Sequence, residues 1–337
     1  MKRTLQIAFI AALTAFFLWL FLRNANLREV GQILRRTQLG WIFIGFTVNF
    51  IALLLRTVRW QTLLDPEDPP PFYPTFFANT VGYMLSNILP IRAADVARPV
   101  LLARRTTHRI SGALGTILIE RILDLTSILG LFVYFALRRW NEFSHNASIT
   151  AWLYIVRAGA IASLVILVLL AILMIGMAFF RPRIRRTHEW LGKILPQRFR
   201  DSWMHFFDTF TETLEIVKNR RVLAKVLLCT AGVWACLTSQ FWFAAKSLDR
   251  AVPFDASFFV TGVTTVGAAI PTPGAIGGFH KACQLVLTRF YAFDIETSVA
   301  VAVLFHLIGT LPVLVLGLAL AAREGLRWKD VSRATNE

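Results

Sequence analysis

Apolar residues along this chain come in runs that are long enough to cross a bilayer. The clearest run covers residues 158–180 and contains no charged side chain. As a helix rising about 1.5 Å per residue it would reach roughly 34 Å, which exceeds the apolar thickness of a membrane. Six such runs are predicted to span: 5–22, 39–55, 110–137, 158–180, 222–244 and 297–322. The pattern predicts an all-α, polytopic membrane protein with one integral membrane domain over residues 1–337.

Two further apolar stretches are interrupted by residues that break helices. Residues 75–90 are short and hold two asparagines, and residues 256–292 are broken by "PTPGAIGG" at 271–278. Backbone polar groups in hydrocarbon need partners, so such breaks survive only inside protein or beside a wet cavity. Both stretches are therefore predicted to be re-entrant or discontinuous helices.

Basic residues give the predicted orientation. Segment 181–221 carries ten lysines and arginines, which favours a cytoplasmic loop, and its residues 202–219 resemble an amphipathic helix at the inner interface. Segment 91–109 carries five arginines, and the polar tail 323–337 is also basic. Both chain ends are expected in the cytoplasm, with 5–322 as the membrane region.

This orientation determines the side of the membrane to which each interrupted stretch must return. Residues 75–90 must enter from the cytoplasmic side and return to it, whereas residues 256–292 must return to the outer side. The basic loop 23–38 is the exception, because it is placed outside. Two interrupted segments that enter from opposite faces are typical of transporters with inverted repeats and a site near the midplane. The similarity of "NILPIRAADVAR" to "AAIPTPGAIGGFHK" is short, and an inverted repeat stays an open question.

Composition supports a membrane protein and no nucleic-acid partner. Hydrophobic residues make up 56% of the 337 residues, and the formal net charge is +16. The basic residues cluster beside apolar runs, as in loops that face an anionic leaflet, and no nucleic-acid-binding pattern accompanies them. A multi-pass protein of the cell membrane is expected, in a bacterial-type inner membrane or cell envelope.

Charged residues inside one predicted span are the first candidates for function. The motif "IERILDL" places Glu120 and Asp124 four residues apart on one helix face, with Arg121 at its edge. Charges at this depth usually face a bundle interior. They would form either an internal salt bridge between helices or a direct contact with cargo or a proton.

A second candidate follows the first break. The motif "LPIRAADVARP" contains Arg92, Asp95 and Arg98. A helix that begins near Ala93 would combine free N-terminal amides with Arg92 into an anion site. The alternative is an ordinary basic loop.

The third candidate is the second break itself. Pro271 and Pro273 would stop one half-helix, and three glycines would allow close approach of the backbone: Gly274, Gly277 and Gly278. A tight turn with only a structural role is the alternative.

His280 and Lys281 would lie in the first turn of the next half-helix. Lys281 opposes the dipole of its own helix, so a negative group is expected nearby. Glu120 or Asp124 could supply it, and so could an anionic ligand such as a phosphate.

Three further residues stand at the predicted end of the second span: Arg56, Arg59 and Trp60. Arginine and tryptophan there are typical of an interfacial anchor, and a cargo contact is the alternative. His306 lies within the last span and is predicted to be a core histidine rather than a proton relay.

Common catalytic motifs are absent. The sequence has no HExxH, CxxC or GxxxxGK[ST] pattern, so no metal site, cofactor, nucleotide-driven pump or enzyme is predicted. The three cysteines have no metal-type spacing.

With these motifs the chain resembles the flippase-like family, also called the lysylphosphatidylglycerol synthase transmembrane region. The resemblance covers roughly residues 5–322 and rests on "RTVRW", "NILPIRAADVAR", "ERILDL" and "PTPGAIGG". It implies paired re-entrant helices, inverted halves and the movement of a lipid or polyprenyl lipid. The soluble synthase domain of larger relatives is not expected here.

Together these features predict a lipid translocase for an anionic phospholipid or polyprenyl phosphate. The head group would occupy a wet cavity between the breaks, beside Arg92, Arg98 and Lys281. Two alternatives are a transferase that acts on a lipid carrier, with Glu120 as its carboxylate, and an accessory subunit of a lipid-synthesising enzyme.

Overall fold

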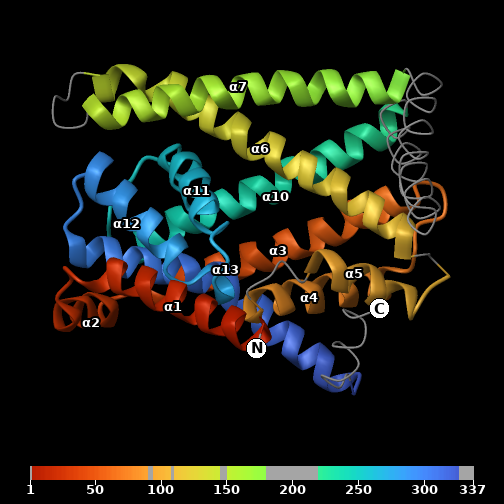
Figure 1. The fold of residues 1–337 in the computed structure, drawn as a ribbon, viewed down its shortest axis with the longest axis horizontal. Coiled ribbons are helices and arrows are strands. Elements are labelled where there is room, and N and C mark those ends of the chain that lie inside the picture. Colours follow the sequence, from red (N-terminus) through yellow and green to blue (C-terminus); the bar gives the residue numbers. More distant parts are fainter. Residues whose placement is uncertain (1, 90–93, 108–109, 145–149, 180–218, 326–337) are drawn as a thin grey trace.

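The protein is helical throughout the part of the chain that the structure describes. The computed structural model describes residues 2–89, 94–107, 110–144, 150–179 and 219–325 (Figure 1). Four helices in it are long and apolar enough to cross a membrane: Leu39–Leu64, Tyr154–Leu173, Arg220–Ser247 and Ile295–Arg323. The predicted all-α membrane architecture is confirmed.

Two helices at the N-terminal end form a sharply bent pair. Helix α1 (Lys2–Leu22) is followed by α2 (Leu27–Arg35), and their axes differ in direction by 78°. Asn26 begins α2, because its side chain accepts a hydrogen bond from the amide of Arg28. If this bent pair is one broken span, it adds a fifth candidate to the four.

The remaining helices show the same order of long and short helices in two halves of the chain. The first half has α3 (Leu39–Leu64), α4 (Phe72–Ile88), α5 (Ala94–Ala103) and α6 (Ile110–Ser144), and α7 (Thr150–Phe179) follows it. The second half has α10 (Arg220–Ser247), α11 (Ala256–Gly267), the 3₁₀ turn η3 (Pro273–Ala275), α12 (Gly278–Phe290) and α13 (Ile295–Arg323). Each half therefore places two short helices between two long ones. This order agrees with a repeat, while the inversion of the halves and the re-entry of the short helices stay predictions.

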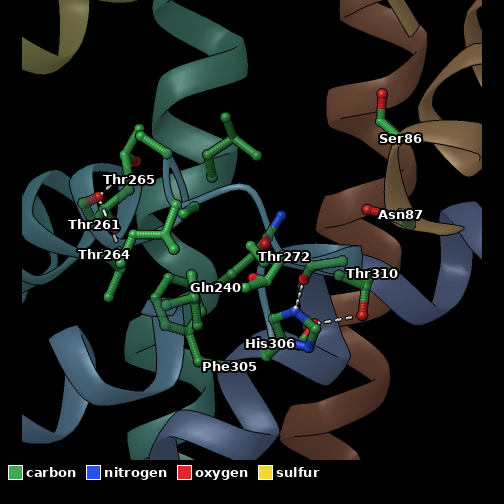
Figure 2. Close-up of a pocket in the computed structure, with 18 of the residues that line it drawn as sticks. Ser86, Asn87, Gln240, Thr261, Thr264, Thr265, Thr272, Phe305, His306 and Thr310 are labelled. Carbon is green, nitrogen blue, oxygen red and sulfur yellow. Dashed lines mark hydrogen bonds between the residues drawn. The ribbon is translucent and has the colours of Figure 1, made fainter. Parts of the chain in front are cut away.

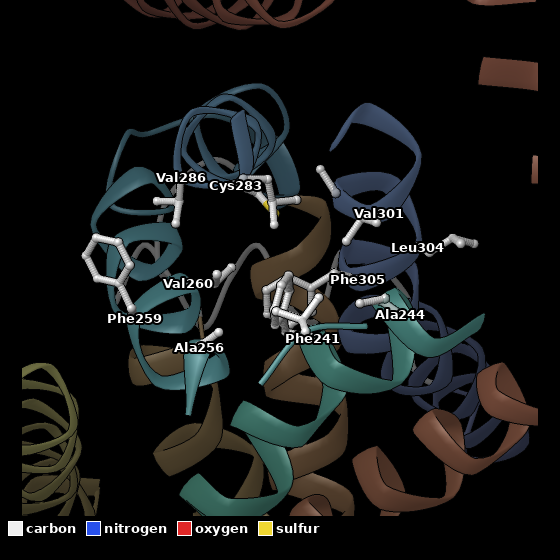
Figure 3. Packing of buried hydrophobic residues seen from close by; sticks show 14 of the residues in the cluster. Phe241, Ala244, Ala256, Phe259, Val260, Cys283, Val286, Val301, Leu304 and Phe305 are labelled. Carbon is white, nitrogen blue, oxygen red and sulfur yellow. The ribbon is translucent and has the colours of Figure 1, made fainter. Parts of the chain in front are cut away.

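The two halves interlock instead of lying apart. Helix α3 packs along α10, and α13 contacts helices of both halves, α3 and α4 as well as α10 and α12. One core cluster lies among α10, α11, α12 and α13 and includes Phe241, Val260 and Phe305 (Figure 3). A second cluster around Trp60 and Phe77 joins α3, α4 and α5.

Helix α7 lies along one edge of the molecule and packs against α6 (Figure 1). Most of its apolar side chains are exposed, as expected for a helix that faces lipid.

Two helices, α3 and α6, extend beyond the predicted C-terminal ends of their spans. The second span was expected to end at residue 55, but α3 continues to Leu64. Arg59 and Trp60 therefore lie inside a helix and are fully buried, so neither is an interfacial anchor. Helix α6 likewise extends to Ser144 beyond the predicted 110–137.

Three predictions fall outside the described residues. These are Arg92 in the first break, the amphipathic helix 202–219 with nearly all of the basic loop 181–221, and most of the tail 323–337.

Candidate functional site

The second break lies against the C-terminal end of α4. Gly274 in η3 has a φ of +58°, a conformation that favours glycine. A Cβ atom added there would lie 3.0 Å from the carbonyl oxygen of Asn87, near the C-terminal end of α4. The glycine thus allows the second break to approach the backbone of α4.

A cavity of about 610 Å³ lies between the end of α4 and the second break (Figure 2). Its walls come from the end of α4, from α10 and α11, from the 268–275 break and from α13. Polar side chains on these walls include Ser86, Asn87, Gln240, Thr261, Thr264, Thr265, Thr272, His306 and Thr310. No lysine, arginine, aspartate or glutamate is among the described residues that line it. We call this space the polar cavity.

Four buried polar groups on the cavity wall have no hydrogen-bond partner within the described residues. They belong to side chains that are at most 8% exposed, and they are Trp234 Nε1, Gln240 Nε2, Thr261 Oγ1 and Thr272 Oγ1. An unpartnered buried polar group costs about 1–3 kcal/mol. All four belong to side chains that line one cavity, although the atoms themselves are shielded from solvent in this structure.

His306 connects the last helix to the second break. Its Nε2 lies 2.7 Å from the carbonyl oxygen of Gly274, and its ring centroid lies 4.5 Å from that of His280. The amide of Gly277 donates to Nδ1 of His280 at 3.4 Å. The two histidines thus help to hold the break in place.

The other glycines of the break are positions of close packing. Gly277 has a φ of +90°, and an added Cβ would lie 2.7 Å from Cβ of Phe17 in α1. A Cβ at Gly278 would lie only 2.4 Å from the carbonyl oxygen of Gly267, which ends α11. Pro271 lines the cavity, and Pro273 begins η3.

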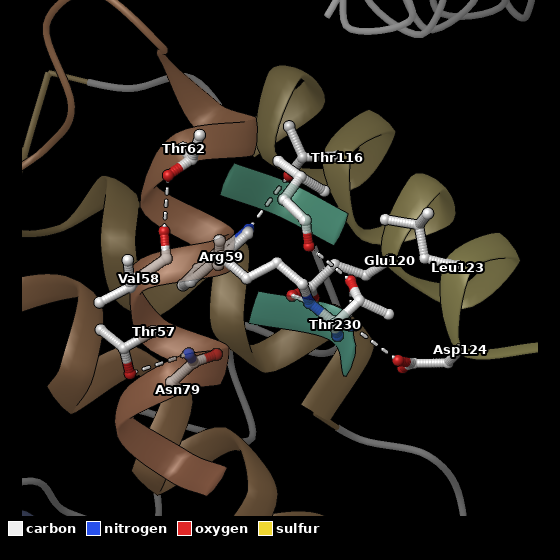
Figure 4. Close-up of polar contacts among 12 residues, drawn as sticks. Thr57, Val58, Arg59, Thr62, Asn79, Thr116, Glu120, Leu123, Asp124 and Thr230 are labelled. Carbon is white, nitrogen blue, oxygen red and sulfur yellow. Dashed lines mark hydrogen bonds and ion pairs between the residues drawn. The ribbon is translucent and has the colours of Figure 1, made fainter. Parts of the chain in front are cut away.

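A separate cluster of buried charges joins α3, α5 and α6 (Figure 4). Arg59 lies 3.4 Å from Glu120 and 2.9 Å from Asp124, and Nη1 of Arg98 donates to Glu120 at 2.7 Å. Arg59, Arg98 and Glu120 are fully buried. These contacts make the cluster an internal ion-pair network, one of the two alternatives for this motif.

The network continues toward its more exposed edge. Arg121 lies 3.3 Å from Asp95 and 3.5 Å from Asp124. Trp60 donates through its indole N–H to Thr116 at 3.0 Å, and the guanidinium of Arg98 lies 4.2 Å from the Trp60 ring. The cluster therefore holds the three helices together.

Two of the predicted head-group cations do not line the cavity. Arg98 is engaged by Glu120, and Nζ of Lys281 donates to Oε1 of Gln284 at 2.6 Å. Lys281 forms no ion pair with Glu120 or Asp124, since both carboxylates are bound by arginines. Neither side chain was placed correctly, because sequence alone does not say which charges meet between helices.

Arg56 differs from the other arginines of this region. Its guanidinium lies 4.6 Å from the centroid of the Tyr83 ring, and within the described residues no carboxylate is in ion-pair distance. Tyr83 lies one helical turn before Asn87 on α4, and Asn87 lines the cavity. Arg56 thus forms no ion pair among the described residues, although it interacts electrostatically with Asp124.

Most of the cavity residues were missed from the sequence. Gln240, Thr261 and Thr272 lie in apolar segments, where polar side chains are costly and mark functional positions by default. Such neutral polar residues are a weaker signal of function in a sequence than charged residues are.

Comparison with known proteins agrees with this architecture. The family described as the lysylphosphatidylglycerol synthase transmembrane region matches residues 4–317 of the chain. A UPF0104 membrane protein of Pyrococcus horikoshii is 23% identical over 316 residues, which cover 90% of this chain and 91% of the relative. One of Methanocaldococcus jannaschii is 27% identical over 235 residues, covering 69% of this chain and 91% of the relative.

A third UPF0104 membrane protein, from Methanothermobacter thermautotrophicus, is 21% identical and covers 81% of this chain and 82% of its own length. The family match extends over nearly the whole described membrane region, from α1 into α13. The chain is therefore a membrane protein that belongs to the family of the lysylphosphatidylglycerol synthase transmembrane region.

Proposed function

We propose that this protein is a lipid translocase whose cargo places its head group in the polar cavity between the end of α4 and the second break. The observation that carries this proposal is the set of polar side chains that line the cavity, above all Gln240, whose Nε2 has no partner among the described residues. Inside a membrane, polar side chains are costly unless they meet protein partners, water or a polar ligand. A phospholipid or polyprenyl-phosphate head group has the hydroxyl and phosphate oxygens that these donors would bind.

The hydroxyl and amide groups of the described lining suit transient binding. A cavity with fixed cations would hold a phosphate tightly, whereas hydroxyls and amides offer hydrogen bonds that are readily exchanged with water. Arg56, which contacts Tyr83 one helical turn before the cavity residue Asn87, would favour anionic head groups. Movement would be passive or ion-coupled, with both chain ends in the cytoplasm.

A transferase is less well supported by the geometry. Its leading carboxylate would be Glu120, but that side chain is fully buried and paired with both Arg59 and Arg98. A carboxylate held in this way is poorly placed to take up a proton or attack a substrate.

Head-group movement in proteoliposomes tests the proposal. The panel compares zwitterionic, anionic and polyprenyl-phosphate lipids with the wild-type protein and with Gln240→Leu. The substitution keeps the side-chain size and removes the unpartnered amide, so we expect movement of the selected lipid to fall at least tenfold. Thr47→Val is the matched control, since Thr47 is exposed on α3 and bonds only to the carbonyl of Phe43.

Equal movement by the wild type, Gln240→Leu and empty vesicles for every lipid would overturn the proposal. Thermal unfolding of each purified variant in detergent shows whether a loss reflects the cavity or the fold.

A further inference from the structure

A second cavity of about 610 Å³ lies between helices α6, α7, α11 and α12. Its walls are almost entirely aliphatic and aromatic, and include Leu129, Phe132, Val156, Phe259, Val286 and Phe290. Ser163 and Thr265 are the only hydroxyl-bearing side chains among its described lining residues. Below, this space is called the apolar groove.

The apolar groove adjoins the polar cavity. Thr265 and Ala269 line both spaces, and they lie at and just after the C-terminal end of α11. The hydroxyl of Thr265 donates to the carbonyl of Thr261. The two spaces are therefore neighbours that share part of their walls at the end of α11.

Two glycines keep the groove open around Phe132. A Cβ at Gly159 would lie 3.3 Å from the Phe132 ring, and one at Gly262 would lie 3.7 Å from it. Larger side chains at either position would fill space beside this ring. The width of the groove beside Phe132 therefore depends on glycine at position 159 of α7 and at position 262 of α11.

The groove is open at one side and closed at the other. Ile155 is 62% exposed and Val266 is 73% exposed, whereas Phe259 and Val286 are nearly fully buried. The open side lies beside α7, whose other apolar residues face the surroundings, including Ile161, Leu164 and Leu169. In a membrane this opening would face the lipid chains.

We propose that the apolar groove holds one acyl or prenyl chain of the lipid whose head group occupies the polar cavity. This inference rests on the proposed function and names the part of the cargo that it left open. We expect an amphipathic occupant, because the groove and the polar cavity share wall residues Thr265 and Ala269, and we expect it to enter from the bilayer, because the mouth opens beside α7. A lipid meets both conditions, whereas an α-helix of a partner, about 10 Å across, would not pass from the mouth into the polar cavity.

A lipid with a diazirine on one acyl chain tests this assignment. After irradiation of the full-length protein with this probe, we expect the cross-linked peptides to come from the groove walls on α6, α7, α11 and α12. Gly159→Leu and Ile155→Trp narrow the groove from its wall and from its mouth, and each should reduce this cross-linking at least fivefold. Gly130→Leu is the control, because a Cβ atom added at Gly130 on α6 would meet no atom within 4 Å.

Cross-links spread evenly over the exposed face of α7, with no change in Gly159→Leu or Ile155→Trp, would overturn the groove assignment. Ile155→Trp alters an exposed side chain, so it remains informative if Gly159→Leu fails to fold.

The two proposals fail in different ways. Movement that is lost in Gln240→Leu but unchanged in both groove variants would overturn the chain site and leave the translocase intact. Specific cross-linking in the groove without any lipid movement by the wild type would overturn the translocase and support the chain site.

Discussion

Arg98 on α5 donates to Glu120 on α6 at 2.7 Å, and both side chains are fully buried. Glu120 also lies 3.4 Å from Arg59, so one carboxylate serves two guanidinium groups. Removing the negative charge would leave Arg98 without its counter-charge inside the bundle and Arg59 with Asp124 alone. The main role of this pair is thus to hold α3, α5 and α6 together.

Glu120→Gln is expected to destabilise the protein by about 3–5 kcal/mol, the usual effect of breaking a buried ion pair from one side. The measurement is thermal unfolding in detergent, with Glu67→Gln in an exposed loop as the control. The double variant R98M/E120M should be less destabilised than the sum of its two single variants, because the two residues interact directly. A Glu120→Gln protein as stable as the wild type but inactive would instead indicate a chemical role for this carboxylate.

Gly278→Ala is expected to disturb the second break. Its new methyl group would lie 2.4 Å from the carbonyl oxygen of Gly267, and backbone atoms there have little room to move. We expect a loss of about 1–3 kcal/mol, as for other overpacked positions, together with slower lipid movement. Gly130→Ala, which adds a methyl group into open space on α6, should be neutral or slightly stabilising. Equal unfolding temperatures for the two variants would argue against close packing at this break.

Arg56→Gln should change the selectivity for lipids more than the stability. Arg56 stacks on Tyr83 at 4.6 Å and has no carboxylate partner in the described part of the chain. We expect movement of anionic lipids to fall several-fold while that of zwitterionic lipids changes little. Competition between the two lipid classes in one vesicle preparation measures this ratio directly. An unchanged ratio would place Arg56 outside the path of the head group.

Arg139 and Asp255 form a second ion pair, outside the charge cluster. Arg139 near the end of α6 donates to both carboxylate oxygens of Asp255, which precedes α11, at 2.7 and 2.6 Å. These hydrogen bonds hold the pKa of Asp255 below its usual range. We expect Arg139→Gln to cost about 1–2 kcal/mol at neutral pH, since both side chains are partly exposed.

The pH dependence of this loss has a definite sign. The lowered pKa of Asp255 means that its stabilisation is full at neutral pH and declines as the pH falls below about 4, the ordinary pKa of aspartate. The difference in unfolding temperature between the wild type and Arg139→Gln should therefore shrink in acid. Arg138→Gln, at the exposed neighbouring position, should show no such trend. A difference that stays constant down to pH 3 would contradict the pairing.

Much of the fold could be predicted from the sequence, because helices in a membrane must satisfy their own backbone. Uninterrupted apolar runs identified the long helices, and Pro271 and Gly274 identified the second break. The exposure of α7 also follows from its uncharged, almost wholly apolar run from residue 158 onward. Each of these features depends on residues that are close together in the sequence.

The candidate site was harder to predict, since it depends on which helices meet. Arg59 and Asp124 are 65 residues apart, and His306 and Gly274 are separated by 32. No periodicity within a helix specifies such partners. Gln240 illustrates the same limit, because only the packing of α10 against α13 brings it to the cavity wall.

Reversible blocking of the polar cavity tests whether the lipid head group passes through it. The variant carries Thr310→Cys on the cavity wall, in a background where Cys236, the one half-buried native cysteine, is alanine. One reconstituted sample is measured before labelling with a bulky thiosulfonate reagent, after labelling, and after reduction. The control is Asp68→Cys in the exposed loop between α3 and α4.

If the head group passes through the cavity, lipid movement should fall to the level of empty vesicles on labelling Thr310→Cys and return on reduction, while the Asp68→Cys control is unaffected. Complete labelling of Thr310→Cys with unchanged lipid movement would contradict passage of the head group through the cavity.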